Sequence, residues 1–324
     1  WQLLLSGRDR YGLERTASGT SANVLPADHA APDGPRLLVR SALHTTGRID
    51  VLGAVVVGAG FIGLEFAAAA RESGCEVTVV EALDRPLARV VSATTAEHFT
   101  RLHRRAGTEL LFGQCVAALH GDGREGVTAV ELADGRRLPA DLVLIGVGVA
   151  PRTELAAAAG LAVNGGITVD SRLLTSDPRI SAIGDCAAFR HMRYGTRLRL
   201  ESVQNAVGHA RLVAERLTGT SRAYDELPWF WSDQFATTLQ IAGLDEKHDT
   251  EVVIGDDPDA FSVLLFRGEE LQAVESVNRP ADHLAARRLI DRGIGLSPDE
   301  AGAPGFTLKG HLSRGREGSI VPAG

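Results

Sequence analysis

The sequence has few cysteines, and their spacing argues against several kinds of site. Three occur in 324 residues, Cys75, Cys115 and Cys186, and no two form a C-x2-C or C-x4-C pair. A reactive dithiol needs two thiols within reach, and an iron–sulfur cluster needs four ligands, usually cysteine. We therefore expect neither, and we interpret Cys75 and Cys115 as small buried hydrophobic residues. The missing disulfide set favours a reducing compartment, and we expect the cytoplasm.

Long apolar runs, metal-ligand spacings and a strong net charge are also missing. The sequence contains no run of about 18 apolar residues, the length that a helix needs to span a bilayer. The formal net charge is −7, so the chain as a whole does not attract nucleic-acid phosphates. The ten histidines show no H-E-x-x-H or similar spacing, and we interpret His98, His103 and His209 as helix-surface residues. We predict no metal site, no membrane association and no nucleic-acid partner.

What is present is the composition of a folded protein. Hydrophobic residues make up 44% and charged residues 23%, which is ordinary globular usage. The length corresponds to about two domains of ~150 residues. Residues 6–36 are rich in Gly, Ser, Pro, Asp and Arg without a sustained period, which predicts loop. The chain begins with Trp1, and we interpret it as the tail of a longer reading frame.

The first strongly patterned segment is a βαβ unit that begins at Val51. VLGAVVV is typical of a parallel strand buried on both faces, and LEFAAAARESG of a helix that ends at Gly74. EVTVVEA follows as a second strand. Downstream, TAEHFTRLHRRAG, ESVQNAVGHARLVAERLTG and ADHLAARRLIDRG predict helices, and the apolar runs GITVD, ISAIGD, TTLQIAGL, TEVVIG and FSVLLFRG predict strands. The order predicts an α/β fold.

The turn of this βαβ unit reads G-x-G-x-x-G, formed by Gly58, Gly60 and Gly63 with Phe61 and Ile62 between the last two. The first glycine permits the tight turn, the second lets backbone approach a pyrophosphate, and the third packs helix on strand. The following helix N-terminus favours an anion. The motif therefore predicts a dinucleotide site, and the alternative is a glycine-rich turn without a ligand.

An acidic residue ends the second strand at the distance this motif requires. Glu81 can accept hydrogen bonds from both hydroxyls of an adenosine ribose. A 2′-phosphate would be repelled by Glu81 and Asp84, which favours NADH over NADPH, although Arg85 lies nearby.

Two later glycine positions also follow apolar runs. Gly146 and Gly148 end LVLIGVGV, where they border the same crevice or are an ordinary strand exit. Gly184 and Asp185 end ISAIGD, where the carboxylate can accept a bond from a sugar-alcohol hydroxyl or cap the next helix.

A tryptophan pair marks the change of texture after Leu227. Trp229 and Trp231 flank Phe230, and strand alternation places both indoles on one face. That face is either core or a flat surface for a ring system or a partner.

The order of GAGFIGLE, VTVVEA, LIGVGVAP, TSDPRISAIGDCA, ESVQNAVGHA and PWFWSDQ resembles the FAD-dependent, NADH-using ferredoxin reductases of bacterial oxygenase systems. These are flavoproteins with two dinucleotide-binding domains, and the resemblance covers about residues 37–310. It implies an irregular segment 1–50, a Rossmann-like NADH-binding domain 51–150, the second half of an FAD-binding domain 151–227, and a small α+β C-terminal interface domain 228–324.

The resemblance also implies cofactor contacts, but no certain catalytic side chain. It places Glu65 beside the nicotinamide side of NADH, and Gly146, Val147 and Gly148 near the nicotinamide. Gly184 and Asp185 match the second FAD motif. The remaining matches are Glu201, Gln204 and Asn205 along the isoalloxazine, and Trp231 near the flavin.

The implied reaction is hydride transfer from NADH to flavin N5, followed by single electrons to a separate 2Fe-2S ferredoxin. We expect a monomer or weak homodimer. The first FAD motif of the family does not precede Leu52, so we expect NADH to bind and FAD to be held weakly or not at all. The alternatives are a truncated NADH-binding paralogue without redox turnover, and a related reductase whose acceptor is rubredoxin or a nitrite reductase system.

Overall fold

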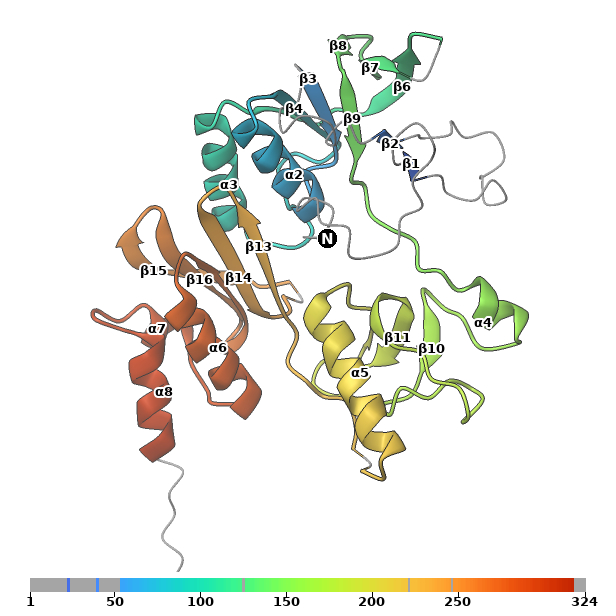
Figure 1. Ribbon diagram of the computed structural model, residues 1–324. Helices are drawn as coiled ribbons and strands as arrows, with labels where there is room; N and C mark the ends of the chain where they lie inside the picture. The colour runs from blue at the N-terminus through green and yellow to red at the C-terminus, as the bar shows by residue number, and fades with distance from the viewer. Residues whose placement is uncertain are drawn as a thin grey trace, which may run out of the picture. The chain divides into compact units, whose positions relative to one another are not determined.

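The computed structural model describes residues 53–317 apart from 124–125, 221 and 246, together with the short antiparallel strands β1 (Ala22–Asn23) and β2 (Val39–Arg40). The rest of the predicted segment 1–50 lies outside the described residues. The chain forms two compact units, each of which has most of its residue contacts within itself (Figure 1). Unit 1 holds residues up to 89, 96–147 and 234–236, and unit 2 holds 90–95, 148–233 and 237 onward. The predicted limits of the four segments stay a prediction.

Unit 1 is built on the predicted βαβ unit. Its parallel sheet has the order β5-β4-β3-β9, and helix α2 (Phe61–Glu72) packs on β3 and β4. A smaller antiparallel sheet of β6, β7 and β8 shares a core with it around Val55, Val130 and Val143. The strands are β3 (Gly53–Val57), β4 (Glu76–Glu81), β5 (Glu109–Phe112), β6 (Val116–Gly121), β7 (Val127–Leu132), β8 (Arg137–Pro139) and β9 (Leu142–Ile145).

The first part of unit 2 is a small sheet with one long helix. Strands β10 (Ile167–Val169), β11 (Ala187–Arg190) and β12 (Arg197–Leu198) pair in that order. Ser202 caps helix α5 by accepting a bond from the Asn205 N–H, which starts the helix where the sequence predicts it. The helical elements are α4 (Glu154–Ala158), the 3-10 turn η2 (Gly184–Cys186) and α5 (Val203–Leu217).

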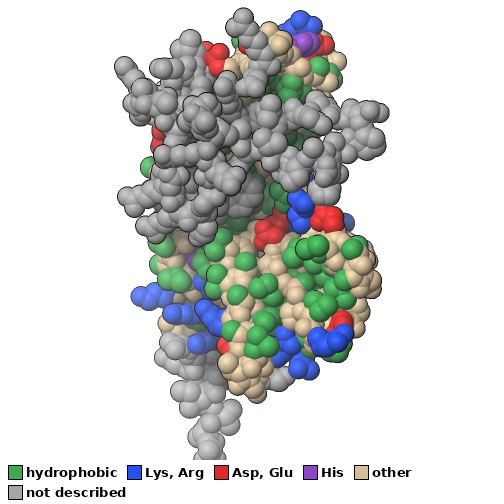
Figure 2. Space-filling model, turned by 45° about the vertical axis from the view of Figure 1, so that its right-hand side comes forward, with side chains coloured by type: hydrophobic (Ala, Val, Ile, Leu, Met, Phe, Trp, Pro, Cys, Tyr) green, Lys and Arg blue, Asp and Glu red, His purple; other side chains and the backbone are tan. Residues whose placement is uncertain are grey.

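The prediction of a strand over ISAIGD is wrong. In this segment only an isolated bridge between Leu174 and Ser181 forms, and the chain then enters η2. Ile180 and Ile183 are each 39% exposed. On the face of the molecule that Figure 2 shows, hydrophobic side chains also reach the surface. An apolar run forms a strand only if a neighbouring strand pairs with it, and none of the described strands pairs with this run.

The second part of unit 2 is a five-stranded sheet of order β13-β14-β17-β16-β15, with helices after it. Its core contains Leu264, Phe266, Leu289 and Leu308. Strand β17 lies between β14 and β16, antiparallel to both. The elements are β13 (Trp229–Gln234), β14 (Thr237–Gly243), β15 (Thr250–Asp257), β16 (Ala260–Arg267), β17 (Glu270–Val277), α6 (Pro280–Arg292), α7 (Pro298–Ala301) and α8 (Leu308–Glu317).

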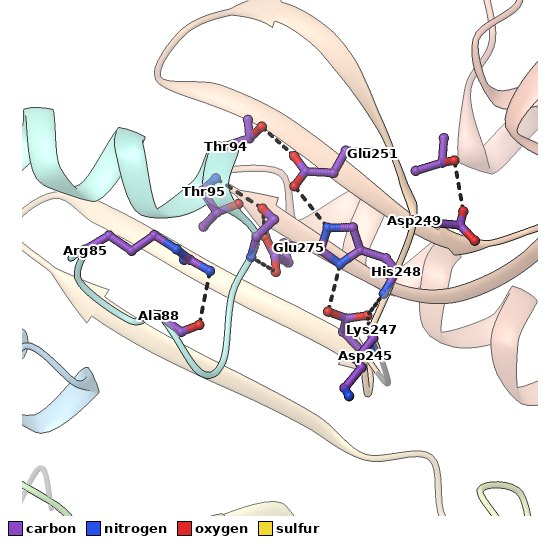
Figure 3. A network of polar contacts seen from close by, with 12 residues as sticks. Arg85, Ala88, Thr94, Thr95, Asp245, Lys247, His248, Asp249, Glu251 and Glu275 are labelled. Carbon is purple, nitrogen blue, oxygen red and sulfur yellow. Dashed lines mark hydrogen bonds and ion pairs between the residues drawn. The ribbon is translucent and has the colours of Figure 1, made fainter. Parts of the chain in front are cut away.

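Carboxylates of this sheet bind the first turn of helix α3 (Ala93–Arg105) (Figure 3). The backbone N–H and the hydroxyl of Ser92 donate to the Glu275 carboxylate, at 2.8 and 2.6 Å. The Thr94 hydroxyl donates to Glu251 at 2.6 Å, and His248 contacts the other oxygen of Glu251 at 3.1 Å. We call these five residues the α3 clamp.

Three histidines and one cysteine contradict the sequence predictions. His98, His103 and His209 are buried, with at most 2% exposure, instead of lying on helix surfaces. The reason is that a wide face of α3 and of α5 is covered, so polar positions beside the apolar stripe are enclosed. Cys75 is buried as predicted, but Cys115 is exposed in the loop between β5 and β6. None of the helices in the described ranges is long and apolar enough to cross a bilayer.

Candidate functional site

The glycine turn of unit 1 excludes side chains at two of its three glycines. A Cβ on Gly58 would lie 2.5 Å from the Gly146 carbonyl oxygen, and a Cβ on Gly63 would lie 2.0 Å from the Gly58 oxygen. Gly58 also has a φ of +100°, which L side chains rarely adopt. These contacts bring strand β3, helix α2 and the loop after β9 together at the carboxyl end of the sheet.

Gly60 differs from its neighbours, because a Cβ there would meet no atom of the described chain within 4 Å. It lies directly before α2, with extended backbone. The N-terminus of a twelve-residue helix carries free N–H groups and a partial positive charge. An open position at this point fits a pyrophosphate, which needs both the donors and the room.

Glu81 holds the glycine turn in place. One carboxylate oxygen accepts the Ala59 N–H at 2.7 Å and the other accepts the Leu83 N–H at 2.9 Å. An ionised carboxylate has about four lone-pair sites, so it can accept ribose hydroxyls as well. Arg85 donates to the Ala88 carbonyl at 3.1 Å (Figure 3).

The other predicted NADH contacts, apart from Gly148, lie in unit 1, on α2 and in the loop after β9. The Gly146 N–H donates to the Val57 carbonyl at 2.8 Å, and Val147 is 62% exposed. Phe61, Ile62 and Glu65 are half-buried in the first turns of α2. The position of Glu65 beside the nicotinamide side of NADH stays a prediction. Gly148 is the first residue of unit 2 after this loop.

In unit 2 the second motif forms a left-handed turn. Gly184 has a φ of +70°, and its N–H donates to Nδ1 of His209 at 3.1 Å. Arg199 donates to the Asp185 carbonyl at 3.1 Å and to the Glu201 carboxylate. Partial desolvation and the neighbouring Glu201 charge raise the pKa of the Asp185 carboxyl, and Arg199 opposes them.

The start of α5 presents polar side chains beside this turn. The Asn205 amide donates to the Leu200 carbonyl at 3.1 Å. Both polar atoms of the Gln204 amide are buried and lack a partner among the described residues. They line a cavity of about 20 Å³ that Ser202, Asn205 and Trp229 also line, which has room for one water molecule. A ring system therefore does not fit inside this cavity.

The two indoles contact each other, as strand alternation predicts. The Trp229 and Trp231 ring centroids are 5.9 Å apart, and both residues are half-buried. The guanidinium of Arg287 stacks over Trp229 at 4.3 Å. Burial lowers the pKa of Arg287, although Asp291 and Glu226 act to raise it.

The described residues offer the kinds of group that NADH and FAD require. Gly60 leaves room at a helix N-terminus, and the Gln204 amide and Asp185 carboxylate are polar groups of the kind a flavin and its ribityl chain require. Arg199 and Tyr224 are not among the residues predicted from the sequence, and His209 is predicted there as a helix-surface residue. His209 follows Asn205 by one helical turn, so helix periodicity was a signal that it shares the buried face.

Two protein-family models match the chain. The family model of pyridine nucleotide-disulphide oxidoreductases matches residues 17–210, and the model of the reductase C-terminal domain matches residues 229–312. The chain belongs to the pyridine nucleotide-disulphide oxidoreductase family. The first match begins at residue 17, which is before residue 37, where the resemblance described from the sequence motifs begins.

Within that family the chain is similar to ferredoxin reductases of oxygenase systems, as the motif order indicates. Rhodocoxin reductase of Rhodococcus erythropolis is 44% identical over 93% of this chain and 71% of its own length. The ferredoxin reductase for the CYP199A2 system of Rhodopseudomonas palustris is 48% identical with a TM-score of 0.78, over 81% of this chain and 65% of that chain. The chain is 38% identical to the reductase in the crystal structure of the covalent putidaredoxin reductase–putidaredoxin complex, with a TM-score of 0.79. This match covers 83% of this chain and 65% of that chain.

Proposed function

We propose that this protein passes electrons from NADH through FAD to a 2Fe-2S ferredoxin that serves an oxygenase. The observation that carries the proposal is the glycine turn, which is closed to side chains at Gly58 and Gly63 and open at Gly60. The similarity to rhodocoxin reductase and to the solved putidaredoxin reductase complex supports the ferredoxin as acceptor.

Each unit contributes binding groups of its own. In unit 1, the first N–H groups of α2 bind the pyrophosphate of NADH, and Glu81 accepts from its adenosine ribose. The negative charge of Glu81 repels a 2′-phosphate, so NADH is preferred over NADPH. In unit 2, Asp185 binds the ribityl chain of FAD, and Gln204 and Trp231 contact the flavin ring. FAD, when bound, supplies a carrier that accepts two electrons and releases them one at a time.

The proposal is tested on the purified full chain with added FAD and with NADH or NADPH. Protein fluorescence measures the two nucleotide affinities, and we expect NADH to bind at least tenfold more tightly. Flavin absorbance under anaerobic conditions measures bound FAD and its bleaching by NADH. A 2Fe-2S ferredoxin and a rubredoxin are then compared as acceptors.

We expect NADH to bleach the bound flavin and the ferredoxin to be reduced faster than the rubredoxin. NADH binding without any flavin reduction would support the truncated, non-redox paralogue instead. Faster reduction of rubredoxin would leave the reductase chemistry intact and change the acceptor. Equimolar FAD retained through purification would overturn the expectation that FAD is held weakly.

A further inference from the structure

A buried histidine holds the turn that begins the second FAD motif. Gly184 is buried, and its left-handed conformation directs its N–H at the imidazole of His209, one helical turn after Asn205. The 3.1 Å distance from that nitrogen to Nδ1 is within hydrogen-bond range. His209 therefore satisfies a buried backbone donor that no strand partner satisfies.

Two aromatic rings fix the orientation of His209. Its ring lies 5.0 Å from the Phe189 centroid and 4.4 Å from the Tyr224 centroid, edge-on to both. Phe189 and Tyr224 are also edge-to-face with each other, at 5.4 Å. The three rings form a closed triangle, so the imidazole cannot rotate away from Gly184 without displacing one of them.

Tyr224 joins this triangle to the start of α5. Its hydroxyl contacts Oδ1 of Asn205 at 3.3 Å, and it packs over Gly208, where a Cβ would lie 2.8 Å from that hydroxyl oxygen. The Tyr224 N–H donates to the Ser171 carbonyl at 2.7 Å. The same rings thus support Gly184 on one side and Asn205 on the other.

The tautomer of His209 follows from these contacts. Nδ1 accepts a hydrogen bond, so the single proton of the neutral ring is on Nε2. Burial lowers the pKa of His209 to about 4, which keeps the ring neutral and Nδ1 free to accept near neutral pH.

We propose that His209 is a positioning residue for the FAD site: by accepting the Gly184 N–H it sets the backbone from which Asp185 reaches the ribityl chain. The inference rests on the proposed FAD function and adds a residue that does not touch the cofactor. An Asp185 whose backbone is not held must be ordered when FAD binds, and that ordering weakens binding.

The test compares two side chains at position 209 that differ in the atom placed where Nδ1 lies. His209→Asn puts a carbonyl oxygen there, and His209→Leu puts a methyl group. FAD is titrated into the full chain and followed by flavin fluorescence and absorbance. We expect His209→Leu to bind FAD about tenfold more weakly, the loss of one hydrogen bond, and His209→Asn to bind within about threefold of the parent. Exchange of the Gly184 amide with deuterium should be faster in His209→Leu only.

Leu212→Ala is the matched control, because Leu212 lies on the same buried face of α5 and is 1% exposed. It should lower the melting temperature while the folded protein keeps the parent FAD affinity. If His209→Leu does not fold, His209→Met takes its place, since it is flexible and a poor acceptor. Equal FAD affinity in parent and His209→Leu, or equal losses in His209→Leu and His209→Asn, would overturn the inference and leave the FAD proposal standing. No FAD binding by the parent at any concentration would remove the FAD proposal itself, and the positioning role with it.

Discussion

At the scale of single residues, the three glycines of the G-x-G-x-x-G motif have different roles. Gly58 and Gly63 are required by the fold, because a Cβ at either position would overlap backbone atoms. Gly60 faces open space and has a φ of −79°, which any residue adopts. Gly58 and Gly63 therefore permit the turn, and Gly60 leaves room for the ligand.

This separation predicts opposite outcomes for two alanine substitutions. Gly63→Ala should lower the free energy of unfolding by about 3 kcal/mol or more, because the new Cβ collides with the Gly58 carbonyl. Gly60→Ala should cost about 0.5 kcal/mol, the usual difference at a helix N-cap, and weaken NADH binding at least tenfold. Urea unfolding and NADH titration measure the two effects, with FAD titration as the control. An NADH affinity unchanged in folded Gly60→Ala would contradict the proposed pyrophosphate position.

At the scale of elements, the α3 clamp attaches the first turn of α3 to the five-stranded sheet, whose strands come more than 100 residues later in the chain. Glu275 is 1% exposed in β17, and its two oxygens accept the N–H and the hydroxyl of Ser92. Burial raises the pKa of Glu275, and the bonds from Ser92 act to lower it. Ser92 also accepts the Thr95 N–H at 3.2 Å, so it is both the helix cap and the residue that the sheet binds.

The clamp predicts non-additive effects of substitution. Ser92→Ala and Glu275→Gln should each lower the free energy of unfolding by about 1–3 kcal/mol, since each leaves a buried polar group without its partner. The loss of unfolding free energy in the double variant should be about 1 kcal/mol smaller than the sum of the two single losses, because the shared contact is lost only once. Urea unfolding of the four proteins gives the coupling energy. Additive losses would show that Ser92 and Glu275 act independently.

At the scale of the whole molecule, buried histidines couple stability to pH. Burial lowers the pKa of His209 and of His283 to about 4, with the Arg287 charge contributing at His283. Both lie in unit 2. Desolvation acts to lower the pKa of His248, but hydrogen bonds to Asp245 and Glu251 outweigh it and raise that pKa, so His248 acts in the opposite direction.

His209 and His283 should therefore each reduce the stability of unit 2 as the pH falls from about 6.5 to about 4, whereas Glu275, whose pKa is raised by burial, acts in the opposite direction. In this range the unfolded histidines bind protons and the folded ones do not, and each contributes up to about 3 kcal/mol. Urea unfolding followed by fluorescence of Trp229 and Trp231 measures the dependence. His283→Leu should reduce the slope by about 1.4 kcal/mol per pH unit, and His248→Gln should not reduce it. An unchanged slope in His283→Leu would mean that His283 titrates normally in the folded protein.

The βαβ unit, the glycine turn, Glu81 and the family can all be predicted from the amino-acid sequence. These follow from short-range patterns, since a buried parallel strand, a tight turn and a helix start each require particular residues within a few positions.

Which polar residues are buried, and which apolar runs pair as strands, depends on how the folded chain packs. His209 meets Gly184, Ser92 meets Glu275, and the ISAIGD run remains without a strand partner, because each of these outcomes depends on residues distant in the chain. Periodicity shows that a helix has a buried face, but only packing sets how wide that face is and which backbone donors a buried histidine must satisfy.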